Sequence, residues 1–363
     1  MVPLKRPRGP AAWALCRALT GALVSLAATQ PGLQPTGHVG NLARPVANNA
    51  VAAATIGGER WIFTALGIDS TKRWSGITNS AAAWSARTRS WRTLPPVPGV
   101  RGRLAATAQV VRGQLVVFGG YTVDSSGAER SLPDVNVFDP ATGQWRLGAP
   151  IPVPVDDAVS GVFRDSLIYL VSGWHDTDNV RDVQIYDVMR DSWSRATPIP
   201  GPGVFGHSGS LANGVIVYVD GAVRQSTGAK YRLEPQTWVG TIDAAQPARI
   251  TWSAGRKHPG PALYRAAAGS CGPYIILAGG SANPYNYNGI GYDGQPSAPE
   301  RGVLAFDTRD QSWRQLPPLA TPTMDHRGLA VLGDTAWIIG GMRGGQQVSP
   351  SAVGVSLGIC PSS

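Results

Sequence analysis

Six polar residues stand at comparable places in this chain, each a short distance before a glycine doublet or a degraded form of one. They are an asparagine, an aspartate, a histidine and three arginines: Asn49, Asp157, His207, Arg103, Arg265 and Arg327. Arginine holds a carboxylate through two parallel hydrogen bonds, so three arginines around one hollow would bind an anion. Histidine and aspartate can transfer protons near neutral pH. These residue types predict an acidic ligand, with Asp157, His207 and the later Asp220 as candidate acid/base groups.

Small residues follow several of these positions. Examples are Ala105-Ala106-Thr107-Ala108, Ser208-Gly209-Ser210 and Ala266-Ala267-Ala268-Gly269. Short side chains suit strands that crowd around a common axis, so each polar residue should begin an innermost strand and point into one shared pocket. A structural interpretation is also open, in which the arginines cap strand ends or bridge neighbouring sheets.

The elements that would position these residues are visible in residues 104–145. This stretch contains four short apolar or alternating runs separated by turn residues, which is the pattern of four β-strands. The second run ends in Gly119-Gly120, and the fourth holds Trp145. One four-stranded sheet leaves both of its faces uncovered, so it needs copies of itself to pack against.

Copies of this unit occur along the chain. Six doublets or degraded doublets recur at intervals of 48 to 61 residues, and they are Leu66-Gly67, Gly119-Gly120, Ser172-Gly173, Asp220-Gly221, Gly279-Gly280 and Gly340-Gly341. A tryptophan follows four of them at a matching place, namely Trp91, Trp145, Trp193 and Trp313, while the fourth unit is irregular with Trp238 and Trp252. Glycine lets neighbouring backbones approach, and the tryptophan should cover apolar area between units.

This order of doublet, acidic turn and late tryptophan resembles the kelch repeat of β-propellers. The resemblance covers roughly residues 45–358 and implies an all-β, six-bladed kelch-type β-propeller. The last unit offers only three strand signals, so an N-terminal strand should close the ring, and residues 38–46 are available for it. We therefore expect a linker at residues 28–37, the propeller at residues 38–358 and a tail at residues 359–363.

Residues 1–27 resemble a secretory signal peptide. A basic start without acids, including Lys5 and Arg6, precedes an apolar stretch at residues 18–27, and Ser25-Leu26-Ala27 fits a cleavage site. A disordered or misassigned start is the alternative. We expect a secreted or periplasmic protein without a membrane contact after cleavage, since no apolar run reaches the roughly 18 residues of a spanning helix. The formal charge of +9 comes without basic clusters, which argues against a nucleic-acid partner.

Cleavage of that signal would leave two cysteines, Cys271 and Cys360. In an oxidising compartment they could pair and tie the C-terminal tail to the fifth unit, and two buried thiols are the alternative. No Cys/His spacing typical of a metal site is present. The histidines are scattered and do not match the copper site of oxidases built on kelch propellers. We therefore expect neither a metal nor a cofactor.

The longest insertion between strand signals is the loop at residues 281–300. It combines tyrosines, including Tyr287 and Tyr292, with asparagines and glycines. Flat aromatic faces suit the C–H groups of sugar rings, and amides suit sugar hydroxyls. The loop follows a doublet, so it should hang over one mouth of the ring. A plain long loop is the alternative.

The chain also resembles one family within the kelch proteins, the secreted bacterial N-acetylneuraminate epimerases, also called sialic acid mutarotases. The residues that carry this resemblance are Asn286-Tyr287-Asn288-Gly289 with Tyr292, and Gly340-Gly341-Met342-Arg343-Gly344-Gly345 followed by Ser351-Ala352-Val353. The second motif is one residue shorter here than in the family. The resemblance implies that an acid/base pair interconverts sugar anomers without a cofactor, and that Arg103, Arg265 or Arg327 binds the sugar carboxylate.

One position departs from that family. Its proposed basic glutamate directly follows the glycine of the fourth blade, where this chain has Ala222. Alanine cannot accept a proton, so the base would have to be Asp157, His207 or Asp220, or the protein binds without catalysing. Two functions stay open: a mutarotase or epimerase acting on an acidic sugar, and a non-catalytic propeller that presents a binding surface to a glycan or a protein partner.

Overall fold

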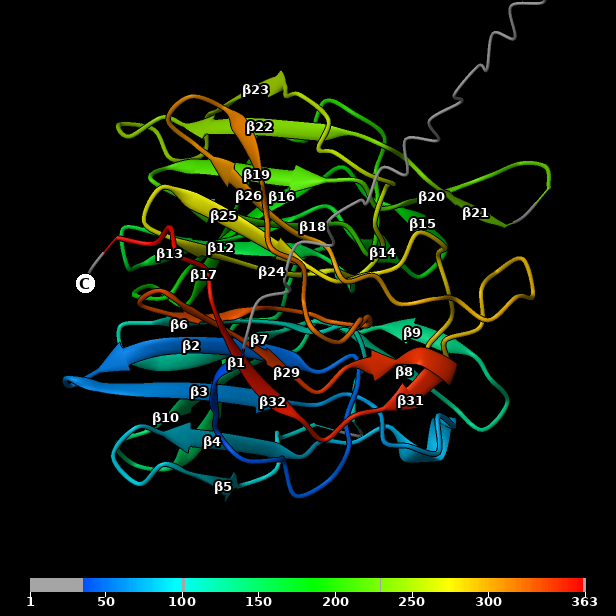
Figure 1. Ribbon diagram of the computed structural model, residues 1–363. Coiled ribbons are helices and arrows are strands. Elements are labelled where there is room, and N and C mark those ends of the chain that lie inside the picture. Colours follow the sequence, from blue (N-terminus) through cyan, green and yellow to red (C-terminus); the bar gives the residue numbers. More distant parts are fainter. Residues whose placement is uncertain (1–34, 100–101, 229, 362–363) are drawn as a thin grey trace, which may run out of the picture. The chain divides into compact units, whose positions relative to one another are not determined.

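The computed structural model describes residues 35–99, 102–228 and 230–361. In these residues the chain forms six four-stranded antiparallel sheets, whose innermost strands together line an axial cavity (Figure 1). This confirms the all-β, six-bladed propeller expected from the repeats. The proposed signal peptide, residues 1–27, lies outside the described residues.

The six sheets, or blades, are numbered in chain order, each from its innermost strand outward. Blade 1 is β2 (Ala50–Ile56), β3 (Glu59–Ala65), β4 (Ala81–Ser85) and β5 (Ser90–Leu94), and blade 2 is β6 (Thr107–Val111), β7 (Gln114–Phe118), β10 (Val135–Asp139) and β11 (Gln144–Leu147). Blade 3 is β12 (Val159–Phe163), β13 (Leu167–Val171), β16 (Val183–Asp187) and β17 (Ser192–Ala196), and blade 4 is β18 (Ser208–Ala212), β19 (Val215–Val219), β22 (Thr237–Ile242) and β23 (Ile250–Ala254). Blade 5 is β24 (Ala267–Cys271), β25 (Tyr274–Ala278), β26 (Val303–Asp307) and β27 (Ser312–Leu316), and blade 6 is β28 (Ala330–Leu332), β29 (Thr335–Ile339), β32 (Ala352–Ser356) and β1 (Pro35–His38).

The ring is closed by the N-terminal strand β1, which pairs antiparallel with β32 of the last blade. The closing strand is therefore residues 35–38 rather than the expected residues 38–46. Residues 35–37 belong to the propeller and not to the expected linker, whose other residues lie outside the described ones. The chain after β1 continues along the gap between blades 6 and 1, where Leu42 N–H donates to Pro350 O.

The second strand of each blade is apolar on both faces because it is covered on both sides. In β7, Leu115 and Val117 belong to the hydrophobic cluster shared with blade 1, whereas Val116 and Phe118 belong to the cluster shared with blade 3. Successive strand residues point to opposite faces, so one continuous apolar run serves two neighbouring blades. The strand runs seen in the sequence are therefore the source of packing between blades.

The glycine doublets lie where neighbouring blades approach each other. A Cβ atom on Gly119 would lie 2.2 Å from Val155 O of the chain entering the next blade, and one on Gly340 would lie 2.3 Å from Val46 O. Both glycines have positive φ, which other residues adopt at a cost. The crowding expected at the doublets is confirmed.

Tryptophans of the outer strands tie each blade to the one before it. Their indole Nε1 atoms donate to backbone carbonyls of the segment that leaves the preceding blade: Trp145 to Pro95, Trp193 to Ala149, Trp252 to Thr197 and Trp313 to Arg256, at 2.8 to 3.2 Å. In the irregular fourth blade, Trp252 rather than Trp238 therefore holds the repeated position. The tryptophans supply a specific bond between blades as well as apolar cover.

The two ends of the ring differ. Figure 1 shows short hairpins gathered at one end, the hairpin end: β8–β9 (Tyr121–Val123, Glu129–Ser131), β14–β15 (Trp174–His175, Asp178–Asn179), β20–β21 (Ala222–Arg224, Tyr231–Leu233) and β30–β31 (Met342–Arg343, Gln347–Val348). Two single-turn 3₁₀ helices, η1 (Trp74–Gly76) and η2 (Gly344–Gln346), belong to the corresponding loops of blades 1 and 6. The opposite end, the turn end, carries the tight turns that join the two inner strands of each blade.

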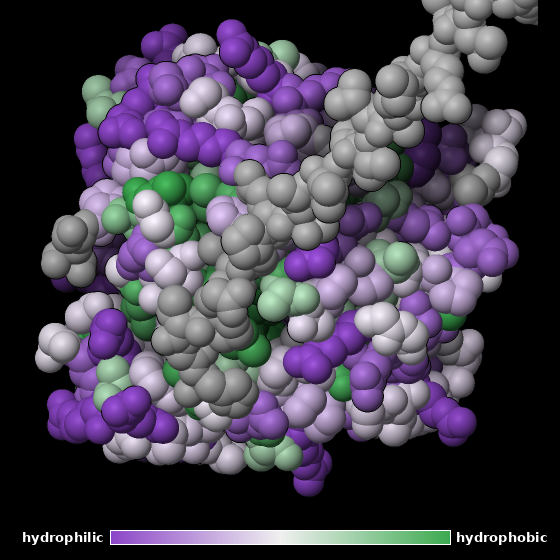
Figure 2. All heavy atoms as spheres, viewed as in Figure 1, coloured by the Kyte–Doolittle hydropathy of each residue, from purple (hydrophilic) through white to green (hydrophobic). Residues whose placement is uncertain are grey.

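The outer surface is mostly polar. Figure 2 shows hydrophilic side chains around much of the rim and a smaller group of hydrophobic side chains near β25. Among the described residues, no helix has the length and apolar character needed to cross a membrane.

The C-terminal tail is fastened to blade 5 by a disulfide bond between Cys271 and Cys360, which settles the alternative left open by the sequence. Asp334, in the inner turn of blade 6, also accepts hydrogen bonds from the backbone N–H groups of Ile359 and Cys360. The bond joins residues 89 positions apart, so it closes a long loop in the unfolded chain.

We predict that Cys360→Ser lowers the free energy of unfolding by about 2–4 kcal/mol, because the unfolded chain regains the freedom of that loop. Urea denaturation in oxidising buffer measures this loss. A reducing agent should destabilise the wild type by a similar amount and leave the variant unchanged. Equal sensitivity of both chains to the reductant would contradict a stabilising role for the bond.

Candidate functional site in the axial channel

A ring of hydrogen bonds joins all six blades where their inner strands begin. One residue per blade there has a left-handed backbone, with φ from +50° to +68°: Asn48, Ala105, Asp157, Gly206, Arg265 and Asp325. At five blade boundaries a backbone N–H donates to a carbonyl of the neighbouring blade: Asn48 to Asp325, Asp157 to Ala105, Gly206 to Asp157, Arg265 to Gly206 and His326 to Arg265. At the sixth, Ala105 N–H donates to Asn48 Oδ1 at 2.5 Å.

The six polar residues expected at this place do not share one register. Asp157 and Arg265 hold it, Asn49 and His207 follow it by one residue, Arg103 precedes it by two and Arg327 follows it by two. Counting back from the doublets misplaces the residues because inner strands differ in length, from seven residues in β2 to three in β28. The better signal is the residue just before the left-handed position, which is apolar in five blades: Ala47, Leu104, Phe205, Tyr264 and Met324.

Asp157 is the centre of a buried ionic network on the axis. Arg265 donates to it twice, from Nε to Oδ1 at 3.0 Å and from Nη2 to Oδ2 at 2.6 Å. Arg327 Nη1 also donates to Asp157 Oδ1, and Arg265 Nη1 donates to Asp325 Oδ1 at 3.1 Å. Asn48 Nδ2 donates to the same oxygen of Asp325 at 3.0 Å. The sequence analysis missed Asn48 and Asp325, which lie in the register it failed to align.

This network keeps Asp157 ionised and engaged. Burial alone would raise the pKa of Asp157, but the charges of Arg265 and Arg327 outweigh burial and hold that pKa below its ordinary value. Arg265 is covered by the rings of Tyr264 and Tyr285, whose centroids lie 5.0 and 5.6 Å from its guanidinium carbon. Arg265 therefore bridges blades, which is the structural interpretation that the sequence left open.

Arg103 and Asn49 also join blades and do not face the axial cavity. Arg103 Nη2 donates to Asn136 Oδ1 at 2.7 Å, and its Nη1 lies 3.2 Å from Asp134 Oδ1. Burial lowers the pKa of Arg103 to about 10, against the charge of Asp134, which raises it. Asn49 Nδ2 donates to Thr64 Oγ1 at 2.7 Å in its own blade and to a carbonyl of blade 6. The expectation that six polar groups face one hollow is wrong for these two residues.

His207 lies beside the axial cavity but is held neutral. Its Nε2 lies 2.9 Å from Val171 O, which fixes this nitrogen as the donor. Burial lowers its pKa to about 3; the bond to Val171 opposes that shift, and the nearby charge of Arg327 adds to it. A histidine with so low a pKa is a weak base at neutral pH.

Asp220 lies outside the cavity, in an ion pair that links blade 4 to the chain entering blade 5. Its Oδ2 lies 2.6 Å from His258 Nε2 and accepts a hydrogen bond from Leu263 N–H at 2.8 Å. The Nδ1 of His258 lies 3.0 Å from Pro259 O, so both ring nitrogens face acceptors. Asp220 occupies the first position of its doublet and bonds to the next blade from there, much as the hydroxyl of Ser172 does in blade 3.

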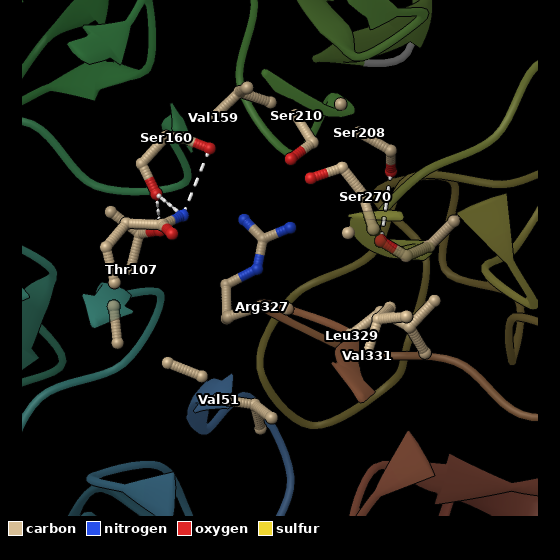
Figure 3. A pocket seen from close by; sticks show the side chains of 18 of the residues that line it. Val51, Thr107, Val159, Ser160, Ser208, Ser210, Ser270, Arg327, Leu329 and Val331 are labelled. Carbon is tan, nitrogen blue, oxygen red and sulfur yellow. Dashed lines mark hydrogen bonds between the residues drawn. The ribbon is translucent and has the colours of Figure 1, made fainter. Parts of the chain in front are cut away.

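The axial cavity has a volume of about 120 Å³ and is lined by the inner strands of all six blades. Figure 3 shows the Arg327 guanidinium projecting into it, surrounded by hydroxyl side chains from other blades. Exposure of the inner strands rises toward their later residues: in β2, Ala50 is buried and Thr55 is exposed. The cavity therefore opens toward the turn end, beyond the layer formed by Asp157, Arg265 and Asp325.

The hairpin end is filled by a cluster of aromatic and apolar side chains. Its buried members include Tyr121, Phe205, Ala222, Tyr231, Tyr264 and Tyr285. Tyr287 and Tyr292 of the long loop pack against this cluster, and the rings of Tyr231 and Tyr292 lie 4.5 Å apart. The loop does hang over this mouth, as expected, but its tyrosines do not line the axial cavity.

Sequence comparisons identify the repeats of this chain. A model described as the kelch motif matches residues 102–152. The chain is 37% identical over 87 residues to a putative F-box/kelch-repeat protein of Arabidopsis thaliana, covering 22% of this chain and 25% of that protein. It is 31% identical over 83 residues to the N-acetylneuraminate epimerases of Shigella flexneri and of Escherichia coli K12, covering 22% of this chain and 22% of each of those proteins.

The fold has a counterpart among solved structures. The structure of YjhT matches with a TM-score of 0.70 over 87% of this chain and 96% of that chain, at 16% sequence identity. The chain is a six-bladed kelch propeller that resembles the N-acetylneuraminate epimerases. The propeller spans only about a quarter of the length of the relatives named above in its sequence matches, so their activities are not carried over with the fold.

We predict that Asp157→Asn destabilises the propeller by about 3–5 kcal/mol, because it leaves two buried guanidinium groups without their shared carboxylate. The free energy of unfolding in urea measures the loss. Asp187→Asn is the matched control: it removes a carboxylate paired with the exposed Arg190 and should cost about 1 kcal/mol or less. Similar losses in the two variants would show that the axial network adds no more than a surface pair.

We predict that the ion pair of His258 and Asp220 gives a stability that falls as pH rises. Burial alone would lower the pKa of His258, but the hydrogen bond and charge of Asp220 raise it above its ordinary value. A raised folded-state pKa means that the contribution is fully present below about pH 6.5 and is lost as pH rises through the folded value. The stability difference between wild type and His258→Gln should shrink with increasing pH; a difference that grows would refute the pairing.

Proposed function

We propose that the protein is a secreted kelch propeller that binds an acidic sugar in its axial channel, without catalysing a reaction on it. The observation that carries this proposal is the placement of Arg327. Its Nη1 donates to Asp157 and its Nε to His326 O at 2.7 Å, so the guanidinium is held in one orientation. Within residues 35–99, 102–228 and 230–361, its Nη2 makes no hydrogen bond, and the group lines the cavity.

The remaining lining suits a polyhydroxylated ligand. Hydroxyl and amide groups of Thr107, Gln109, Ser160, Ser208 and Ser210 line the same cavity. Such groups both donate and accept hydrogen bonds, as sugar hydroxyls do. A fixed guanidinium supplies the one charged contact that a sugar carboxylate requires. Of the expected ligand-binding residues, Arg327 thus carries the proposal, and Arg103, Arg265 and Asn49 support the ring around it.

The groups available for proton transfer argue for binding alone. Asp157 is held between two arginines, His207 is neutral with a pKa of about 3, and Asp220 is paired with His258. Ala222, at the position where the resemblance implies a glutamate, is buried in the hairpin-end cluster. The second candidate is a mutarotase, which the aligned segment of the N-acetylneuraminate epimerases favours.

We predict that Arg327→Gln weakens binding of acidic sugars at least about tenfold, as expected for roughly 1.5–3 kcal/mol from a hydrogen bond to a charged group. Isothermal titration with D-glucuronate and N-acetylneuraminate measures this, with D-glucose as the neutral reference. Arg327→Lys, which keeps the charge, should retain part of the affinity. Arg314→Gln on the outer strand β27 is the matched control and should bind as the wild type does. Equal affinity for acidic and neutral sugars would rule the proposal out.

We also predict that the protein leaves anomer equilibration of N-acetylneuraminate at the rate in buffer. Proton NMR after dissolving one anomer follows this reaction directly. A faster rate that depends on protein concentration would favour the mutarotase instead. In that event His207→Phe and Asp157→Asn would show which group supplies the proton.

A further inference from the structure

We infer that Ser210 and Ser270 complete an anion clamp with Arg327, and that the clamp lies in a channel sized for a compact sugar acid, such as a hexuronate, rather than for N-acetylneuraminate. This inference rests on the proposed binding of an acidic sugar. It assigns the specificity of the site to two hydroxyl groups and to the walls of the channel.

The two serines come from neighbouring blades and face the same guanidinium. Ser210 lies on β18 and Ser270 on β24, and both line the axial cavity together with Arg327. Figure 3 shows their hydroxyl oxygens directed toward the Arg327 side of the cavity. Three potential donors therefore surround one small volume.

These two hydroxyls differ from the others in the channel because nothing in the described chain occupies them. Ser208 Oγ donates to Ala266 O at 3.1 Å, and the hydroxyls of Thr107 and Ser160 bond to each other at 2.7 Å. Ser210 and Ser270 make no hydrogen bond to residues 35–99, 102–228 or 230–361, and their oxygens are not among the sealed polar atoms of that part of the chain. Both are free to bind a ligand.

The donor set matches a carboxylate. A carboxylate has two oxygens with about four acceptor sites, so one oxygen can take Nη2 of Arg327 while the serine hydroxyls donate to the other. The ligand would then lie with its acid group deep in the channel and its hydroxyls toward Thr107, Gln109 and Ser160. A neutral sugar would leave the guanidinium with only weaker partners.

The volume of the channel limits the size of the ligand. About 120 Å³ of space holds roughly eight water positions at about 15 Å³ each, which corresponds to one small sugar acid. The glycerol and N-acetyl arms of N-acetylneuraminate need more room than this.

The walls cannot readily move apart or thin out. The inner strands are already in close contact: a Cβ on Gly269 would lie 2.5 Å from Leu329 O, and one on Gly161 would lie 2.3 Å from Leu211 Cβ. The hydrogen bonds of the axial ring hold the same strands at their first residues. The channel is therefore a rigid sleeve, closed at its inner end by the layer of Asp157, Arg265 and Asp325.

The test is a titration of the full chain with D-glucuronate, D-galacturonate, N-acetylneuraminate and D-glucose. We expect the hexuronates to bind at least about tenfold more tightly than N-acetylneuraminate. Ser210→Ala and Ser270→Ala should each weaken hexuronate binding about tenfold or more. Ser194→Ala, on the exposed outer strand β17, is the matched control and should bind as the wild type does. Melting temperatures check that all variants are folded.

The outcomes separate this inference from the function on which it rests. Hexuronate binding that both serine variants leave unchanged would overturn the clamp while acidic-sugar binding stands. Binding of N-acetylneuraminate as tight as that of the hexuronates would overturn the size limit in the same way. Absence of binding by every acidic sugar would overturn the clamp and the proposed function together.

Discussion

The structure depends on closing six sheets at their inner edges, where space is smallest. One hydrogen bond at each blade boundary does this, at a residue with a left-handed backbone. Four of these six residues are neither glycine nor asparagine, so the conformation is costly and must be held by its surroundings. Side chains supply that support: Arg265 of blade 5 reaches Asp157 of blade 3 and Asp325 before blade 6. Three blades are thereby joined across the axis by one guanidinium.

This constraint decides what the charged residues are free to do. A buried ion pair gains little stability over apolar packing, but loss of one partner is expensive, so such groups fix geometry more than they add free energy. Arg265, Asp157 and Arg103 are committed in this way. Arg327 differs because its second nitrogen bonds to Asp157 from the cavity side of the layer. A single residue of the network thus serves both the ring and the channel.

The fold could be predicted from the sequence because the doublet, the acidic turn and the tryptophan each have a local cause that recurs in most blades. The site could not, since its register depends on strand lengths that vary between blades. A shift of one residue sends a strand side chain to the opposite face, which is why His207 and Asn49 took the wrong place. Ser210 and Ser270 were counted as small spacers. Their importance arises only because Ala266, Thr107 and Ser160 satisfy the neighbouring hydroxyls or each other, and no sequence pattern records that.

The missing glutamate and the closed hairpin end are two aspects of one change. Ala222 is fully buried, and it packs in the cluster that also contains Tyr264 and Tyr285. These two tyrosines cover Arg265 from that side. A carboxylate at position 222 would have to be desolvated among aromatic rings, with Arg265 already engaged by Asp157 and Asp325. The packing that excludes a base there also separates the axial layer from the hairpin end, and it leaves the turn end as the side from which a ligand can reach Arg327.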